Sequence, residues 1–231
     1  LLVLIGVAFP LIVITLAATF GGVSTGPDSA EMAEFVFGMS LVTAMLVGVV
    51  TVIGLTSEYA HNTIRPTYAA TPNRPRVLVA KLIVSTLMAL VVSTVTVAAA
   101  WTSGSTIFNS RGGETSLADD TVLTVLFCTV VLAVLVTWFG FGVGLIVRNS
   151  PASVSLVLLW PLLIEGLLQL TLALLDLDGA SKWVPYQAAI NASASSPPED
   201  ALGRPGGQIV FACVGIGLIS IGMWLDRRRD A

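Results

Sequence analysis

Charged residues are scarce in this chain. Only 11% of its 231 residues are Asp, Glu, Lys or Arg, whereas a soluble domain carries roughly a quarter. In contrast, 55% of the residues are hydrophobic, and the mean hydropathy is +0.91. So few polar side chains cannot coat a globule in water, which excludes a soluble domain and indicates an integral membrane protein.

Residues that carry catalytic or metal chemistry are also rare. A single histidine excludes a histidine-rich metal site. Cys128 and Cys213 both lie inside apolar runs, so we expect two small buried hydrophobic residues and neither a disulfide nor a metal pair. The sequence contains no P-loop of the form GxxxxGKS or GxxxxGKT, no HExxH and no GxSxG. We therefore expect no enzyme activity, bound nucleotide or metal in this chain.

Long apolar runs dominate what is present. A helix needs about 20 apolar residues to cross the hydrocarbon core, and backbone groups in lipid must be paired within the helix. Strand-like alternation is absent, so we predict an all-α integral membrane protein with one transmembrane domain over 1–231. Because neither a basic start nor a cleavage site precedes the first run, we interpret it as a span and not a signal peptide. The six predicted spans are Leu1–Phe20, Phe35–Thr56, Val77–Trp101, Thr121–Val147, Ala152–Leu175 and Gln208–Leu225.

The basic residues predict the orientation of these spans. With the N-terminus inside, eight of the eleven basic residues lie on the cytoplasmic side and three outside. Most acidic residues fall on the outer side in this arrangement. We therefore predict six spans with both termini in the cytoplasm. The inner basic residues are Arg65, Arg74, Arg76, Lys81, Arg148, Arg227, Arg228 and Arg229.

Several features have structural interpretations. Pro10 is expected to kink the first span, and Asp119 and Asp120 are placed to cap the fourth. Gly140 and Gly144 are four residues apart, which gives one face on which another helix can pack closely. Between the fifth and sixth spans, Leu170–Leu175 and Trp183–Ile190 are too short to cross. We expect a re-entrant or interfacial helical segment there.

The fifth span contains an acid, Glu165, with Trp160 and Gln169 nearby. Glu165 and Gln169 share a helix face because they are four residues apart. An acid inside a membrane is costly and usually faces a cavity or a partner. These three residues therefore form a possible translocation path or a protonatable switch. The alternative is a purely structural pairing of Glu165 with a neighbouring helix or with backbone groups.

A polar loop, 57–76, separates the second and third spans. It carries Glu58, His61 and Arg65, and prolines at 66, 72 and 75. One interpretation is a basic turn that only fixes topology. The other is a cytoplasmic loop that contacts a soluble partner.

The order of residues in this loop resembles the permease subunits of ABC-2 type exporters. The matching pieces are Glu58-Tyr-Ala-His-Asn-Thr-Ile-Arg65, then Ala-Thr-Pro72-Asn-Arg74-Pro-Arg76 and Ala-Lys81-Leu. Trp183-Val-Pro185 and the arginine run that ends at Arg229-Asp230 also match. The sequence departs from the family at Asn62, where glycine is usual, although asparagine tolerates the same left-handed turn. A second departure concerns the amphipathic helix that usually precedes the first span: either it is missing, or it lies before Leu1.

The resemblance implies a permease subunit of an ATP-driven exporter in the bacterial cytoplasmic membrane. It implies a hydrophobic or amphipathic cargo, such as a drug, lipid or peptide. Two ABC ATPase subunits would hold ATP and Mg²⁺, and a second permease copy or a paralogue would complete the transporter; no nucleic acid is involved. Residues 57–76 would be the coupling loop, with Glu58, His61, Asn62, Thr63, Arg65 and Arg74 as its site residues.

Two other functions remain open at this point. A proton-coupled secondary carrier would use Glu165, although such carriers usually have inverted repeats and several buried ionisable groups. A membrane scaffold or immunity protein would bind a partner and transport nothing.

Overall fold

The computed structural model describes residues 2–20, 28–61, 63–64, 74–110 and 114–229. The described residues contain helices and no strand, as expected for an all-α protein. The helices are α1 (Leu2–Phe20), α2 (Ser29–Ala60), α4 (Arg74–Asn109), α5 (Asp120–Val147), α6 (Ser150–Leu159), η1 (Trp160–Ile164), α7 (Glu165–Leu174), α8 (Asp178–Ser181), α9 (Pro185–Ser193) and α10 (Arg204–Arg229).

Five described segments are long and apolar enough to cross a membrane. They correspond to the second to sixth predicted spans, and most extend beyond the predicted bounds. The chain is therefore a multi-pass membrane protein. The first predicted span is a helix, but its described apolar part, Leu4–Val13, is shorter than a span. A sixth crossing thus stays a prediction. The five segments are Ser29–Ala60, Pro75–Asn109, Asp120–Val147, Ser150–Leu174 and Arg204–Arg228.

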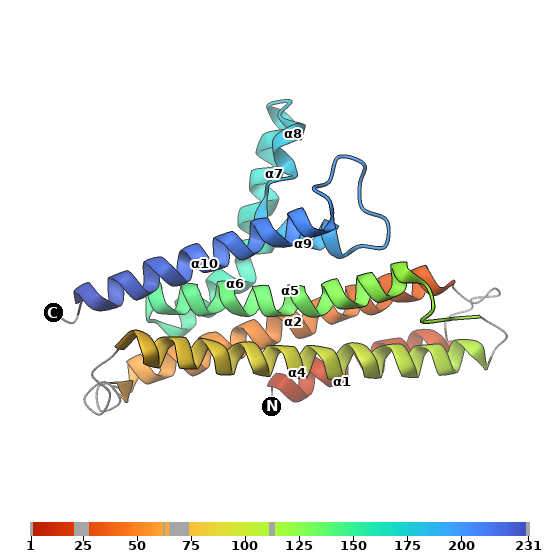
Figure 1. The fold of residues 1–231 in the computed structure, drawn as a ribbon, viewed down its shortest axis with the longest axis horizontal. Coiled ribbons are helices and arrows are strands. Elements are labelled where there is room, and N and C mark those ends of the chain that lie inside the picture. The colour runs from red at the N-terminus through yellow and green to blue at the C-terminus, as the bar shows by residue number, and fades with distance from the viewer. Residues whose placement is uncertain (1, 21–27, 62, 65–73, 111–113, 230–231) are drawn as a thin grey trace.

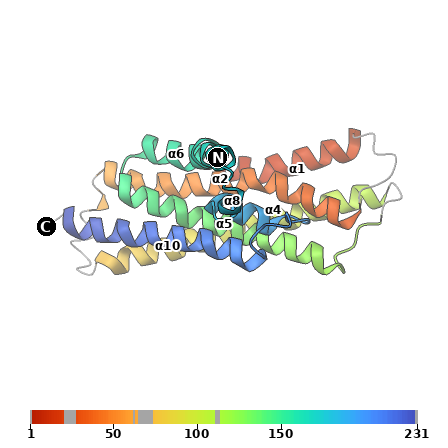
Figure 2. The same ribbon diagram turned by 90° about the horizontal axis from the view of Figure 1, so that it is seen from above.

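The long helices α2, α4, α5 and α10 run side by side and form the body of the molecule (Figures 1 and 2). The end of α2, the start of α4 and the C-terminus lie together at one end of this bundle (Figure 1). We call it the coupling-loop end. The N-terminus lies about midway along the bundle instead (Figure 1). The arrangement of α1 therefore gives no support to a cytoplasmic N-terminus, which stays a prediction.

The fifth predicted span is not straight. The α-helical pattern gives way to one π-helical turn, η1, and α7 then projects sideways from the bundle (Figures 1 and 2). Pro161 explains the change, because it has no N–H to donate and its ring clashes with the carbonyl group four residues earlier. Widening the helix to a π turn relieves that clash. The backbone N–H of Glu165 then donates to the carbonyl oxygen of Trp160.

The N-terminus of α5 is capped by an acidic side chain, as predicted. Asp119 caps α5 and accepts a hydrogen bond from the backbone N–H of Thr121 at 2.8 Å. This confirms the capping prediction for Asp119. The cysteines are both free, as expected, and Cys128 is buried. Cys213 is exposed on α10, so the prediction that it is buried was wrong. An apolar run does not reveal which of its faces will pack and which will meet lipid.

Glycines allow α5 to approach two helices closely. A Cβ atom at Gly140 would lie 3.1 Å from the carbonyl oxygen of Gly48 on α2, and one at Gly144 would lie 3.2 Å from Leu55. The predicted packing face is therefore confirmed. Gly142 serves a second contact, since its Cβ would lie 2.6 Å from the Cβ of Leu218 on α10. Small residues on both sides let α5 occupy the centre of the bundle.

Gly207 provides a direct test of this close packing. A Cβ atom there would collide with the carbonyl oxygen of Ala188 and approach the Cβ of Ala192 to 2.9 Å. We expect Gly207→Ala to lower the apparent melting temperature in detergent, because α9 and α10 must separate. Gly217→Ala is the matched control, since its Cβ meets no described atom within 4 Å. It should be neutral or stabilising by up to about 1 kcal/mol, which is the helix-propensity gain. Equal effects of both changes would contradict the packing argument.

Candidate functional site

The predicted coupling loop, 57–76, begins where α2 ends. His61 is the C-cap of α2, and its backbone N–H donates to the carbonyl oxygen of Ser57 at 2.9 Å. The N–H of Thr63 donates to the carbonyl oxygen of Glu58 at 3.0 Å. His61 and Thr63 are both exposed, so their side chains are accessible to a partner. Asn62 and Arg65 lie outside the described residues, and so does the side chain of Arg74.

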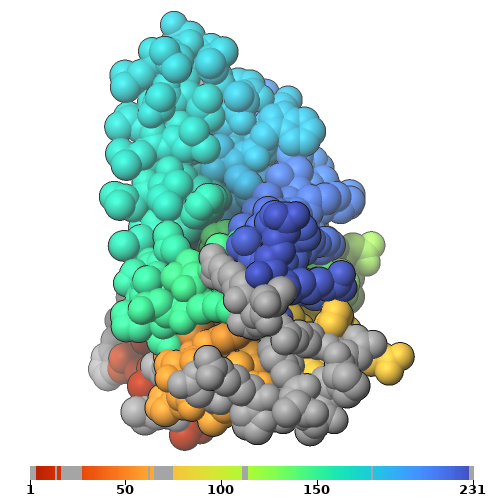
Figure 3. Space-filling model, turned by 90° about the vertical axis from the view of Figure 1, so that its left-hand side faces the viewer, coloured from red at the N-terminus to blue at the C-terminus, as the bar shows by residue number. Residues whose placement is uncertain are grey.

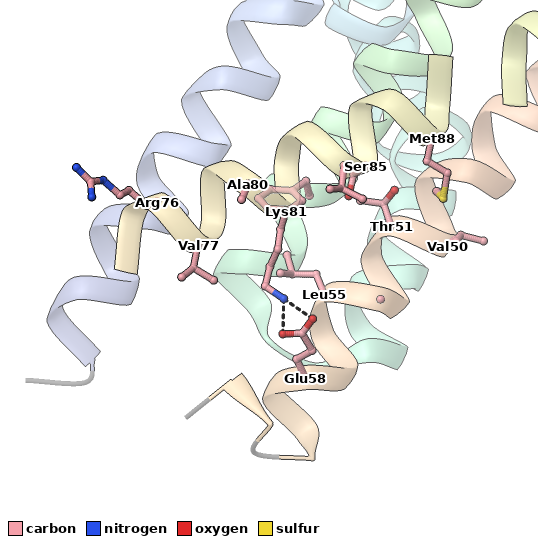
Figure 4. Close-up of a pocket in the computed structure, with 13 residues that line it drawn as sticks. Val50, Thr51, Leu55, Glu58, Arg76, Val77, Ala80, Lys81, Ser85 and Met88 are labelled. Atoms are coloured by element: carbon pink, nitrogen blue, oxygen red, sulfur yellow. Dashed lines mark hydrogen bonds and ion pairs between the residues drawn. The ribbon is translucent and has the colours of Figure 1, made fainter. Parts of the chain in front are cut away.

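Glu58 and Lys81 close the base of this loop. Both carboxylate oxygens of Glu58 accept hydrogen bonds from the Lys81 ammonium group, as Figure 4 shows. The two side chains remain 31% and 25% exposed, respectively. Because Glu58 lies in the last turn of α2 and Lys81 in the second turn of α4, the ion pair joins the two helices that flank the loop.

Tyr59, Arg148 and Asp226 form a second cluster at the same end. The hydroxyl group of Tyr59 donates to Oδ1 of Asp226 at 3.0 Å. The guanidinium group of Arg148 forms an ion pair with the same oxygen and lies over the Tyr59 ring, 4.7 Å from its centroid. Asp226 is only 1% exposed. We call these three residues the Asp226 cluster; it joins α2, α10 and the C-cap of α5. Figure 3 views the molecule from this end of the bundle.

Arg148 also turns the chain sharply. It has a left-handed backbone with φ of 53°, and its N–H donates to the carbonyl oxygen of Gly144 at 3.0 Å. This turn ends α5 and leads directly to α6. Thr56 of α2 and Ser150 of α6 then form a hydroxyl–hydroxyl hydrogen bond of 2.6 Å. The last turns of α2 are therefore bonded to α4, α5, α6 and α10.

Sequence reasoning missed the Asp226 cluster. Arg148 was considered only as a topology signal, and the C-terminal arginine run only as a topology signal and a part of the family resemblance. One indication was present, because acids are rare on the predicted inner side. Glu58 and Asp226 are two of the three acids there, and both are paired with a cation. The partner of each acid could not be chosen from the sequence, because it lies on another helix.

Glu165 is buried, at 2% exposure, and its carboxylate is fully engaged. Oε1 accepts a hydrogen bond from the indole N–H of Trp160 at 2.8 Å and another from the backbone N–H of Tyr186 at 2.9 Å. Oε2 accepts from the backbone N–H of Gln187 at 3.0 Å. The carboxylate thus satisfies two amide groups in the first turn of α9.

This arrangement follows from how α9 begins. Val184 occupies the N-cap position, and it has no polar side chain to accept the amide hydrogens that a helix start leaves unpaired. Glu165 supplies the missing acceptor from a distant part of the chain. A negative charge at a helix N-terminus is also favoured by the helix dipole. The acid therefore fixes α9 to the bend of the fifth span.

Aromatic rings pack near this contact. Phe139 lies 5.4 Å from Trp160 and 5.9 Å from Phe211, measured between ring centroids. Tyr186 meets Phe211 edge to face at 5.6 Å. Gln169, the third predicted path residue, is half-buried on α7. The structure thus joins Trp160 to Glu165 by a hydrogen bond. The Trp160 ring also packs against Phe139 of α5, so these two residues form part of a packed contact between helices.

Among the described residues, no three His, Cys, Asp or Glu side chains gather to hold a metal ion.

Comparison of the chain with models of protein families, with curated proteins and with solved structures finds no match.

Proposed function

We propose that this chain is the permease subunit of an ATP-driven ABC exporter. In this proposal it lies in the bacterial cytoplasmic membrane and moves a hydrophobic or amphipathic substrate out of the cell. ATP hydrolysis takes place in separate ATPase subunits that dock at the coupling-loop end. The resemblance of the loop sequence to ABC-2 permeases is the origin of this proposal.

The bonding of the last turns of α2 is the observation that supports it best. A permease driven by an ATPase needs a loop whose displacement moves membrane helices together. The Glu58–Lys81 ion pair joins the two ends of the loop. The Asp226 cluster joins α2 to α5 and α10. A topology-fixing turn has no need of these additional contacts.

A second permease copy would explain α7. The helix α7 packs chiefly against its chain neighbours η1 and α8. We call η1 and α7 together the projecting arm. Its leucines are exposed, with Leu162 of η1 at 79% and Leu174 of α7 at 77%. The ten residues of α7 span only about 15 Å, which is too short to cross the hydrocarbon. We infer that a partner permease covers part of the projecting arm.

The contacts of Glu165 weigh against a proton-coupled carrier. A protonatable switch needs a carboxyl group that can gain a proton without losing its structural partners. All three hydrogen-bond partners of the Glu165 carboxylate are N–H donors, two of them in the first turn of α9, so the carboxylate serves as a structural acceptor. A scaffold without transport activity agrees with the same contacts, so the test must measure both partner binding and hydrolysis.

Exchanging the charges of Glu58 and Lys81 tests the coupling role. We expect Glu58→Lys and Lys81→Glu, each alone, to reduce ATPase activity stimulated by the permease at least tenfold. Each change puts like charges opposite each other at the base of the loop. The double variant Glu58→Lys with Lys81→Glu should recover most of the activity, because the ion pair is restored with its charges exchanged. The measurement is ATP hydrolysis by the complex that co-purifies from the native operon.

Arg227→Ala is the matched control, because Arg227 is exposed at the same end of the bundle and should leave hydrolysis unchanged. Failure of the double variant to recover activity would show that Glu58 acts directly on the ATPase. Purification of the permease without any P-loop partner would contradict the exporter proposal. A bound partner without substrate-stimulated hydrolysis would favour the scaffold.

A further inference from the structure

A groove of about 670 Å³ runs between α2 and α4 near the coupling-loop end (Figure 4). We call it the α2–α4 groove; Thr51, Gly54, Glu58, Ala80, Lys81 and Val84 are among its lining residues. The groove is open because small residues, Gly54 and Ala80, line it where larger side chains would fill the space. A Cβ atom at Gly54 would have no described atom within 4 Å.

The groove is bordered by apolar side chains that protrude from the bundle. Val84 is 66% exposed, and Ile83 and Ile53 beside the groove are also exposed. Both helices are long and apolar enough to cross a membrane, so these side chains face hydrocarbon. An occupant of the groove must therefore be compatible with the lipid interior. Between Arg76 and Met88 the groove follows α4 for about 18 Å, which is close to the hydrocarbon thickness of one leaflet.

One end of the groove is charged and the other is apolar. Glu58 and Lys81 neutralise each other there, while Arg76 is exposed in the first turn of α4. Figure 4 shows the Arg76 side chain pointing away from the Glu58–Lys81 pair. These three groups leave one net positive charge at the polar end. Val50 and Met88 line the opposite end.

We propose that the α2–α4 groove binds an anionic phospholipid of the leaflet nearest the coupling loop. One acyl chain lies along the groove, and the phosphate group meets Arg76 at the polar end. The acyl chain gains no hydrophobic free energy by leaving the surrounding lipid. Selectivity therefore comes from the charge of Arg76, which can extend to the headgroup layer. This inference depends on the helices lying in a membrane and is independent of the proposed transport function.

The bound lipid would touch both helices that flank the coupling loop, directly beside the ion pair that joins them. An anionic lipid would thus hold α2 and α4 at one separation. The site provides a route by which membrane composition affects the loop.

Native mass spectrometry of the full chain can test this site. The probes are dioleoyl phosphatidylglycerol and dioleoyl phosphatidylcholine, which share acyl chains and differ in headgroup charge. We expect the protein to retain the anionic lipid about fivefold more strongly, which is the preference that one basic side chain near the membrane surface can provide. Arg76→Gln should remove this preference and leave the binding of phosphatidylcholine unchanged.

Two phenylalanine variants then locate the lipid. Gly54→Phe should fill the groove and reduce retention of phosphatidylglycerol about fivefold, to the level of phosphatidylcholine. Gly217→Phe on α10 adds the same side chain where a Cβ also meets no described atom, and it should retain the lipid. Unchanged retention in Gly54→Phe would overturn the proposed location. Equal retention of both lipids by the wild-type protein would overturn the role of charge. A change of oligomeric state in Gly54→Phe would identify a second copy of the chain as the occupant and overturn the lipid proposal.

Discussion

Replacing Glu165 with glutamine is expected to destabilise the protein by roughly 3 kcal/mol, although the change is nearly isosteric. The carboxylate accepts hydrogen bonds from Trp160, Tyr186 and Gln187. A glutamine side chain has one acceptor oxygen, and its NH₂ group would face an N–H donor. At least one buried donor is then left unpaired, and the N-terminus of α9 loses a compensating negative charge.

The measurement is the apparent melting temperature in detergent at a fixed scan rate. A loss of this size lowers the melting temperature by about 6–12 °C in a chain of this length. Glu199→Gln is the control, because it removes the same charge from an exposed position and should have almost no effect. If the Glu165→Gln variant melts at the wild-type temperature but has lost transport, the acid serves in proton transfer and the structural role is wrong.

Replacing Asp226 with alanine should also cost about 3 kcal/mol or more, because removing one partner of a buried ion pair leaves an uncompensated charge. The group left behind is the Arg148 guanidinium, whose side chain is only 17% exposed. Tyr59 loses the acceptor of its hydroxyl group in the same change. The expected result is a large fall in melting temperature and loosening of the ends of α2, α5 and α10.

A double-mutant cycle separates the interaction energy of the Arg148–Asp226 ion pair from other losses of stability caused by each substitution. We expect Asp226→Ala combined with Arg148→Met to be more stable than Asp226→Ala alone, because the buried cation is removed together with its partner. Arg227→Ala controls for loss of charge in the same turn of α10. Strictly additive losses in the double variant would mean that Arg148 and Asp226 do not interact, and the Asp226 cluster would then have no role in joining the helices.

Much of the architecture could be predicted because it depends on local sequence. A run of about 20 apolar residues in lipid has only the helix available to satisfy its backbone groups. The second to sixth predicted spans were therefore recognised as helices, although several of these helices extend beyond the predicted ends. Asp119 could be predicted as a cap because an N-cap acts within three residues. The Gly140–Gly144 face could be predicted because small residues four apart share one side of a helix.

Only part of the candidate sites could be predicted from the sequence. Glu165 could be singled out because an acid inside a membrane span is costly and needs a partner, and Glu58 because its polar loop resembles that of ABC-2 permeases. Their partners, Lys81 and the first turn of α9, could not be chosen from many alternatives of similar chemistry. The sequence places Pro161 inside the fifth span, yet the direction that α7 takes after it depends on how η1 packs beside Phe139.

Hydropathy and backbone pairing act over neighbouring residues, so the sequence was enough to predict a helical membrane protein with several apolar spans. It also identified the loop after α2 and the acid at 165 as unusual. The contacts between distant segments became visible in the folded chain, where Asp226 joins three helices, Cys213 is exposed and Glu165 caps α9. Each of these depends on which helix faces lie together, and long-range packing, not local pattern, determines that choice.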